Sequence, residues 1–177
     1  TAALPDGSAA VFVTDLSGAP ELWSVPASGG QPEQLSGLSE KSAEPSVSPD
    51  GRWAAFSSDF GGDERPDLYL APTAGGEPRN LTSSKRAETT PVFSPDGTKL
   101  AFLADGPQDF LFQLHVLDLK TGTERRLSDE KISLSQPLWS PDGRKLYATL
   151  TPDFGHTGPL VEVAADGSGL RRLEPPV

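Results

Sequence analysis

The dipeptide Asp-Phe recurs three times in the sequence, at Asp59-Phe60, Asp109-Phe110 and Asp153-Phe154. A carboxylate can pair with a cationic group, and an aromatic ring beside it can bury apolar area or contact a cation. The repeated pair is therefore typical of a site that recognises a cationic ligand or a peptide. The alternative interpretation is that each Phe ring packs under its own loop and has a structural role.

A denser acidic segment follows the first pair. Asp59, Asp63, Glu64 and Asp67 lie close together in the sequence, with Arg65 among them. Hard cations such as Ca²⁺ bind several carboxylate oxygens supplied within a few residues, so the segment resembles a calcium-binding loop. Its spacing does not match the Asp-x-Asp-x-Asp-Gly pattern. We therefore favour a solvated acidic loop over a calcium site.

Histidine could also bind a metal or carry a proton. The chain has two histidines: His156 falls in a predicted loop and His115 in a predicted strand. His156 has no evident partner in the sequence, so an incidental position is the favoured interpretation. A polysaccharide lyase would need His, Arg or Lys together with metal-binding side chains, and two histidines are too few to favour it.

The motifs of common enzyme active sites are missing from the sequence. There is no Gly-x-Ser-x-Gly, His-Glu-x-x-His, Walker or Gly-x-Gly-x-x-Gly pattern. The chain has no cysteine, which excludes disulfides, thiolate nucleophiles and Cys-ligated zinc. We therefore expect no catalytic residue, no metal centre and no cofactor in this chain.

Charge and hydrophobicity exclude two classes of partner. The net charge of −10 argues against nucleic acid, because affinity for phosphates rests on Lys and Arg. No apolar run approaches the length of about 18 residues that a membrane-spanning helix needs. The N-terminal segment lacks an initiator Met and a signal-peptide core, so we expect a processed chain or a fragment.

The elements that position these residues repeat along the chain. The turn Ser-Pro-Asp-Gly occurs at 48–51, 94–97 and 140–143, with a variant at 4–7. Two sets of leucines each recur every 46 residues: Leu22, Leu68, Leu114 and Leu160, and Leu35, Leu81, Leu127 and Leu173. The only slip is a connection two residues shorter in the first copy. Regular self-similarity of this length is the signature of a repeat architecture.

Each copy has the hydrophobic pattern of four short strands. In the third copy these are expected at 91–94, 99–103, 112–117 and 123–127. Pro-Asp-Gly suits a tight turn because Pro fixes φ, Asp binds the following amides and Gly accepts positive φ. With 18 Gly, 18 Pro and no helical periodicity, we expect almost no helix. A four-stranded repeat of this length predicts a β-propeller blade.

The units resemble WD40-like (PD40) repeats, which occur in the TolB periplasmic protein and in the propellers of prolyl-oligopeptidase-type serine peptidases. The resemblance rests on three segments: Ser94-Pro-Asp-Gly-Thr-Lys-Leu-Ala-Phe, Asp67-Leu-Tyr-Leu and Gly75-Gly-Glu-Pro-Arg-Asn-Leu-Thr. It covers nearly the whole chain and implies an all-β propeller of four blades, each with four antiparallel strands. The same repeat serves many functions, so it does not by itself identify one.

We expect one propeller domain over 1–177, with blades at about 1–37, 38–83, 84–129 and 130–177. Three arrangements are open: a closed ring of four blades, a homodimer completing an eight-bladed ring, and a segment of a larger propeller. Terminal blades that are left alone expose apolar faces and strand edges to water. We therefore favour a segment of a larger protein, or self-association, over a free four-bladed monomer.

Blade geometry predicts where binding occurs. With strands named A to D from the propeller axis outward, the A–B and C–D turns lie on one rim, and the B–C and D–A connections lie on the other. The second rim has the longer segments, and variable loops on a rigid scaffold commonly carry function. The candidate binding residues on this rim are Asp59, Phe60, Asp63, Arg65, Asp109, Phe110, Asp153, Phe154 and His156.

Three functions fit the sequence. The first is a non-catalytic module, periplasmic or extracellular, that binds a protein or peptide or associates with itself. The second is the gating segment of a prolyl-oligopeptidase-type peptidase, cytoplasmic, with the B–C loops and 85–88 facing a catalytic domain absent from this chain. The third is a designed or excised repeat array, which the divergence between copies disfavours.

Overall fold

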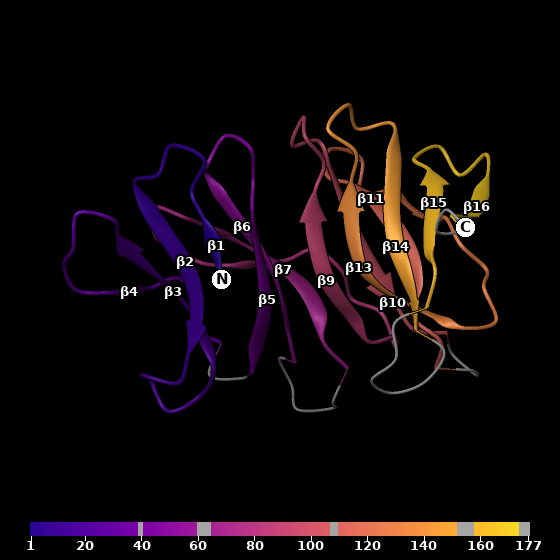
Figure 1. Cartoon of the computed structure of the whole chain (residues 1–177). Helices are drawn as coiled ribbons and strands as arrows, with labels where there is room; N and C mark the ends of the chain where they lie inside the picture. Colours follow the sequence, from indigo (N-terminus) through magenta and orange to yellow (C-terminus); the bar gives the residue numbers. More distant parts are fainter. Residues whose placement is uncertain (39–40, 60–64, 107–109, 152–157, 174–177) are drawn as a thin grey trace. The chain divides into compact units, whose positions relative to one another are not determined.

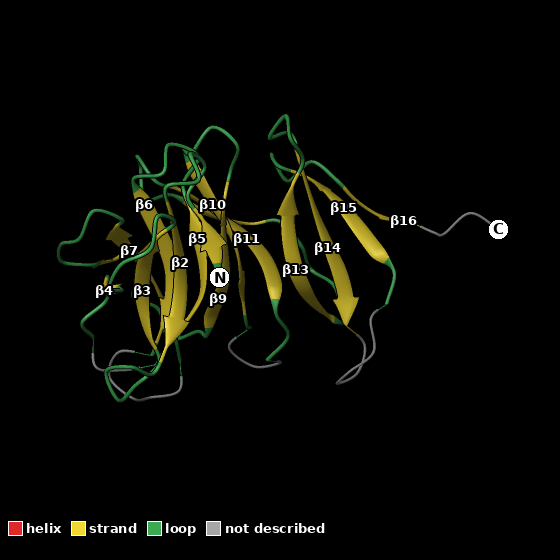
Figure 2. Cartoon of the chain, turned by 60° about the vertical axis from the view of Figure 1, so that its left-hand side comes forward, coloured by secondary structure: helices red, strands yellow, loops and turns green. Residues whose placement is uncertain are grey.

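The computed structural model describes residues 1–38, 41–59, 65–106, 110–151 and 158–173. Within these ranges the chain contains strands, turns and loops but no helix, so none that is long and apolar enough to cross a membrane (Figure 2). The strands form four antiparallel sheets of four strands each. The expected all-β fold is therefore confirmed.

The sheets follow chain order, so each is a blade whose strands A to D are consecutive (Figure 1). The first blade has β1 (Ala2–Ala3), β2 (Ala9–Thr14), β3 (Glu21–Pro26) and β4 (Glu33–Gln34). The second has β5 (Ser42–Val47), β6 (Trp53–Ser58), β7 (Asp67–Pro72) and β8 (Arg79–Asn80). The third has β9 (Glu88–Phe93), β10 (Lys99–Ala104), β11 (Gln113–Asp118) and β12 (Glu124–Arg126). The fourth has β13 (Ser133–Trp139), β14 (Lys145–Thr151), β15 (Leu160–Ala164) and β16 (Leu170–Leu173).

The chain divides into two compact units, 1–93 and 94–177. In the first unit, Phe56 and Tyr69 stack with ring centroids 5.8 Å apart, in a core that also includes Val11 and Leu22. In the second unit, the rings of Phe102 and His115 lie 5.4 Å apart. His115 is thus a buried residue of the sheet. That residues 1–177 form one propeller domain stays a prediction.

The Ser-Pro-Asp-Gly turns are closed by the same contacts in three blades. The Ser94 hydroxyl donates to Asp96 Oδ1 at 2.6 Å and accepts the Lys99 N–H at 3.0 Å. Gly97 has φ of 70°, a conformation that glycine adopts without steric cost. Ser48 and Ser140 make the equivalent contacts with Asp50 and Asp142. The polar groups of these short turns are therefore satisfied internally.

In the first three blades, a second repeated contact ties the outer strand to strand C. The hydroxyls of Ser36, Thr82 and Ser128 accept the N–H of Leu22, Leu68 and Leu114 at 2.8, 2.9 and 2.8 Å. In each case the hydroxyl residue directly follows the leucine of the second repeated set. The hydroxyl therefore also recurs every 46 residues, and the structure shows what it binds.

A backbone hydrogen bond joins strand A of one blade to the segment just before strand C of the preceding blade. In the first unit, Ser42 N–H donates to Pro20 O and Glu88 N–H donates to Pro66 O, both at 2.7 Å. In the second unit, Leu134 N–H donates to Phe112 O at 2.8 Å. These bonds hold the D–A connection that leads into a blade beside the B–C connection of the blade before it.

Candidate functional site

Three of the A strands contain a bulge at the same repeat position. Glu44, Thr90 and Gln136 have φ of 56°, 52° and 54° and are each followed by a proline. The pairing of β5 with β6 skips from Ala43 to Ser46, and that of β13 with β14 skips from Ser135 to Leu138. Proline has no N–H to donate to the ladder, and a bulge lets two residues oppose one.

The bulges store backbone strain. A left-handed conformation costs a non-glycine residue about 1–3 kcal/mol, and it is least tolerated by a β-branched residue such as Thr90. In the first unit the Thr90 N–H donates to Oε2 of Glu44 at 2.7 Å. In the second unit, no side-chain acceptor among the described residues receives the Gln136 N–H. The left-handed residue at Thr90 thus turns a backbone donor toward a carboxylate.

In each unit, the B–C connections carry exposed apolar side chains. Leu16, between β2 and β3 of the first unit, is 65% exposed. In the second unit, Phe110 precedes β11 and is 66% exposed, and Leu160 begins β15 and is 41% exposed. Leu138, on strand β13, is the other exposed large hydrophobic residue in the described ranges. The Phe110 ring therefore does not pack under its own loop.

Arg65 links a B–C connection to the following D–A connection in the first unit. Its Nη1 donates to the backbone carbonyl of Lys85 at 2.5 Å. Next to it, Arg86 Nη2 lies 2.8 Å from Oε1 of Glu88, whose side chain is fully buried. Because a buried carboxylate needs a partner, this pair holds the D–A connection in place. Nothing in the hydrophobic pattern predicts that Glu88 is buried.

The acidic segment is only partly described. Asp59 is half-buried, and its N–H donates to Lys41 O at 3.2 Å. Asp67 accepts the Asn80 amide at 3.0 Å and the Ser84 N–H at 3.4 Å, so its carboxylate binds the outer strand and the following connection. Within the described ranges no three acidic or histidine side chains gather as a metal site would require. Six predicted site residues lie outside the described residues: Phe60, Asp63, Asp109, Asp153, Phe154 and His156.

The sequence profile of the TolB β-propeller domain, PD40, matches residues 2–176. The chain belongs to the PD40 family. This confirms the resemblance drawn from the Ser-Pro-Asp-Gly turns and the repeated leucines. No curated protein sequence matches the chain.

Several solved structures share the fold. A TolB-like protein from Agrobacterium tumefaciens superimposes with a TM-score of 0.77 at 24% identity, covering 99% of this chain and 61% of that one. TolB from Acinetobacter baumannii gives 0.77 at 25% identity, covering 94% and 40%. A puromycin-hydrolyzing peptidase from Mycobacterium tuberculosis gives 0.65 at 19% identity, covering 88% and 27%. The chain thus spans less than two thirds of each of these proteins.

Proposed function

We propose that this chain is a non-catalytic PD40 binding module that takes a protein or peptide ligand on the rim formed by the B–C and D–A connections. One observation carries the proposal: in the second unit, Phe110 and Leu160 are both exposed, and both lie at B–C connections. Exposed large apolar side chains at the tips of a rigid scaffold are typical anchors for a protein partner. The opposite Ser-Pro-Asp-Gly turns have their polar groups bound internally.

The similar TolB structures favour a periplasmic setting, which we include in the proposal. Association of the chain with itself, including a homodimer with eight blades, is a variant of the same function. The homodimer would have a molar mass in solution of twice the 18.7 kDa of one chain. Sedimentation equilibrium would decide it, because a monomer at all concentrations would contradict self-association.

Selection from a random peptide library would test the binding rim. We expect selected peptides to bind Phe110→Ser about tenfold more weakly, which is the loss of one aromatic anchor. Leu138→Ser is the matched control, since Leu138 is 61% exposed but lies on strand A near the Ser-Pro-Asp-Gly turn. Equal affinity for the Phe110 variant, or a loss confined to the Leu138 variant, would contradict the proposal.

A second candidate function is the gating propeller of a serine peptidase. The similarity to the puromycin-hydrolyzing peptidase favours it, although that likeness extends to the fold alone. This function requires an α/β-hydrolase domain with a Gly-x-Ser-x-Gly motif in the same protein, and it implies a cytoplasmic location. Reading the gene on both sides of this segment would decide between the two functions.

A further inference from the structure

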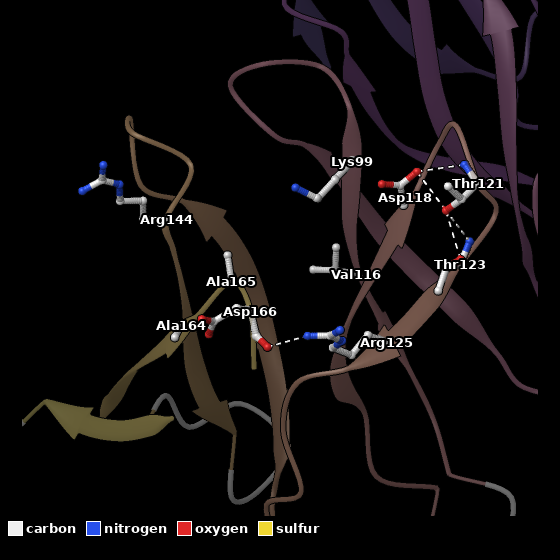
Figure 3. A pocket seen from close by; sticks show the side chains of 10 residues that line it. All are labelled: Lys99, Val116, Asp118, Thr121, Thr123, Arg125, Arg144, Ala164, Ala165 and Asp166. Carbon is white, nitrogen blue, oxygen red and sulfur yellow. Dashed lines mark hydrogen bonds between the residues drawn. The ribbon is translucent and has the colours of Figure 1, made fainter. Parts of the chain in front are cut away.

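A groove of about 700 Å³ lies in the second unit, on the rim opposite the proposed binding site (Figure 3). Strands β10, β11 and β12 form one side of it. The other side is made by two turns of the fourth blade, at Arg144 and at 164–166. Its volume lies in the usual range of ligand pockets, about 300–1,000 Å³.

Three basic side chains line the groove, although the chain as a whole has a net charge of −10. Arg125 Nη1 donates to the backbone carbonyl of Asp166 at 2.6 Å, which fixes its guanidinium across the groove. Within the described ranges, the side chains of Lys99 and Arg144 form no hydrogen bond and no ion pair. Figure 3 shows Lys99 extending from β10 toward the fourth-blade side of the groove.

The two carboxylates in the lining are already bound within their own turns. Asp118 Oδ1 accepts the N–H of Lys120 and of Thr121 at 3.0 and 2.8 Å, and Asp166 Oδ1 accepts the Ser168 N–H at 2.8 Å. These hydrogen bonds hold the pKa of both groups below the ordinary value. Three cations against two anions leave the lining with a charge of +1. Lys99 attracts the carboxylates of Asp96 and Asp118, and Arg144 attracts that of Asp142, without a direct ion pair.

The repeat supplies an internal comparison for this groove. Lys99 pairs across the sheet with Asp118, whereas 46 residues earlier Trp53 pairs with Pro72. The second blade therefore has an apolar pair where the third has a charged pair. One repeat later Lys145 occupies the same position, where it pairs across the sheet with Ala164 and its ammonium lies 3.1 Å from Glu162. Of these two lysines, only Lys99 lines the groove, and within the described residues it has no carboxylate at ion-pair distance.

We propose that this groove binds an acidic peptide segment, with Lys99 and Arg144 as the partners of its carboxylates. A flexible ammonium and a guanidinium on opposite sides suit carboxylates spaced along an extended chain. The hydroxyls of Thr121 and Thr123 line the same groove and can serve the peptide backbone. A polyphosphate fits less well, because Asp118 and Asp166 repel densely spaced negative charge.

Titration of the full chain with a capped tetraglutamate peptide at low ionic strength tests the proposal. We expect Lys99→Gln to weaken binding at least fivefold, and Lys99→Trp, which restores the residue of the second blade, to abolish it. Lys145→Gln is the matched control. Lys145 occupies the same repeat position one blade later, and its ammonium lies 3.1 Å from Glu162. This control is expected to bind like the unmodified chain.

Three outcomes would overturn the proposal: no binding of tetraglutamate, equal binding by the Lys99→Gln variant, or tighter binding of tripolyphosphate than of the peptide. Amide chemical shifts of each variant, compared with those of the unmodified chain, would show that the fold is retained. Phe110→Ser is expected to leave tetraglutamate binding unchanged, so failure at the rim and failure at the groove are distinguishable.

Discussion

The backbone N–H of Thr90 donates a hydrogen bond of 2.7 Å to Oε2 of Glu44, the residue 46 positions earlier. Both residues lie at the bulge of a strand A, so a carboxylate from the second blade binds a backbone donor of the third. The bond lies within the first compact unit. It converts a strained backbone position into a specific link between successive repeats.

Glu44→Ala is expected to lower the free energy of unfolding by about 1 kcal/mol, because the Thr90 N–H loses its charged acceptor. Urea denaturation measures the loss as a lower midpoint with an unchanged slope. Gln136→Ala is the control, since Gln136 occupies the equivalent bulge but accepts no side-chain bond within the described ranges. An equal loss in both variants would show that the Glu44 bond contributes nothing.

Thr90→Asn is expected to raise stability by about 0.5–1 kcal/mol, because Asn tolerates the left-handed region better than a β-branched residue. Thr89→Asn, at the neighbouring position of the same strand, is expected to lower stability because Thr favours a strand and Asn does not. The opposite signs of the two variants, read from thermal unfolding, are the test. A loss of stability in both would mean that the φ of 52° at Thr90 is not a source of strain.

The strands were predictable because their hydrophobic pattern repeats, but their ends were not. Strand β9 was expected to begin at Pro91, and it begins at Glu88 because the chain stays paired through the bulge at Thr90. The prolines at 45, 91 and 137 mark this feature in the sequence through their 46-residue spacing. A strand proline cannot donate to the ladder, which is the physical signal of a bulge.

The groove could not have been found from the register, because Lys99 and Lys145 occupy the same repeat position and only Lys99 lines it. The exposure of Phe110 could not be predicted either, because a sequence does not say which side of a loop a ring occupies. Nor could the burial of Glu88, since its partner Arg86 is known only once the D–A connection is folded. The predicted roles of Phe60, Asp153 and the other rim residues outside the described ranges stay predictions.

Acid is expected to destabilise the chain partly through the Ser-Pro-Asp-Gly turns. The Ser94 hydroxyl, with the Thr98 N–H, lowers the pKa of Asp96 from 3.8 to about 2. In the unfolded chain this carboxyl binds its proton at higher pH, so proton uptake between pH values of about 4 and 2 favours unfolding. The stabilisation is present above the unfolded pKa and is lost as the pH falls through about 2.

Asp96→Asn should therefore show a shallower loss of stability over this acidic range than the unmodified chain. Urea midpoints at neutral pH and at several acidic values measure the effect. Asp15→Asn is the control, because the Asp15 carboxylate accepts no hydrogen bond within the described ranges. Parallel curves for the unmodified chain and the Asp96 variant would show that the turn does not contribute to acid sensitivity.

Removing the hydroxyl of Ser128, one of the repeated hydroxyls, is expected to lower the free energy of unfolding. Its Oγ accepts the Leu114 N–H at 2.8 Å and donates to Oε1 of Gln113 at 2.8 Å, and all three residues are buried. Ser128→Ala leaves a buried donor without its acceptor, so a loss of about 1–3 kcal/mol in unfolding free energy is expected. Faster hydrogen exchange at the Leu114 amide should accompany the loss.

Ser128→Thr is the matched variant, because Thr82 occupies the same repeat position in the second blade and accepts the Leu68 N–H at 2.9 Å. Retaining the hydroxyl should keep most of the stability, so the Thr variant is expected to lose less than half as much as the Ala variant. If the two variants lost the same amount, the cost would come from crowding or repacking at this site. The repeated hydroxyl would then be a feature of packing, and its hydrogen bond to strand C would not be what holds the outer strand.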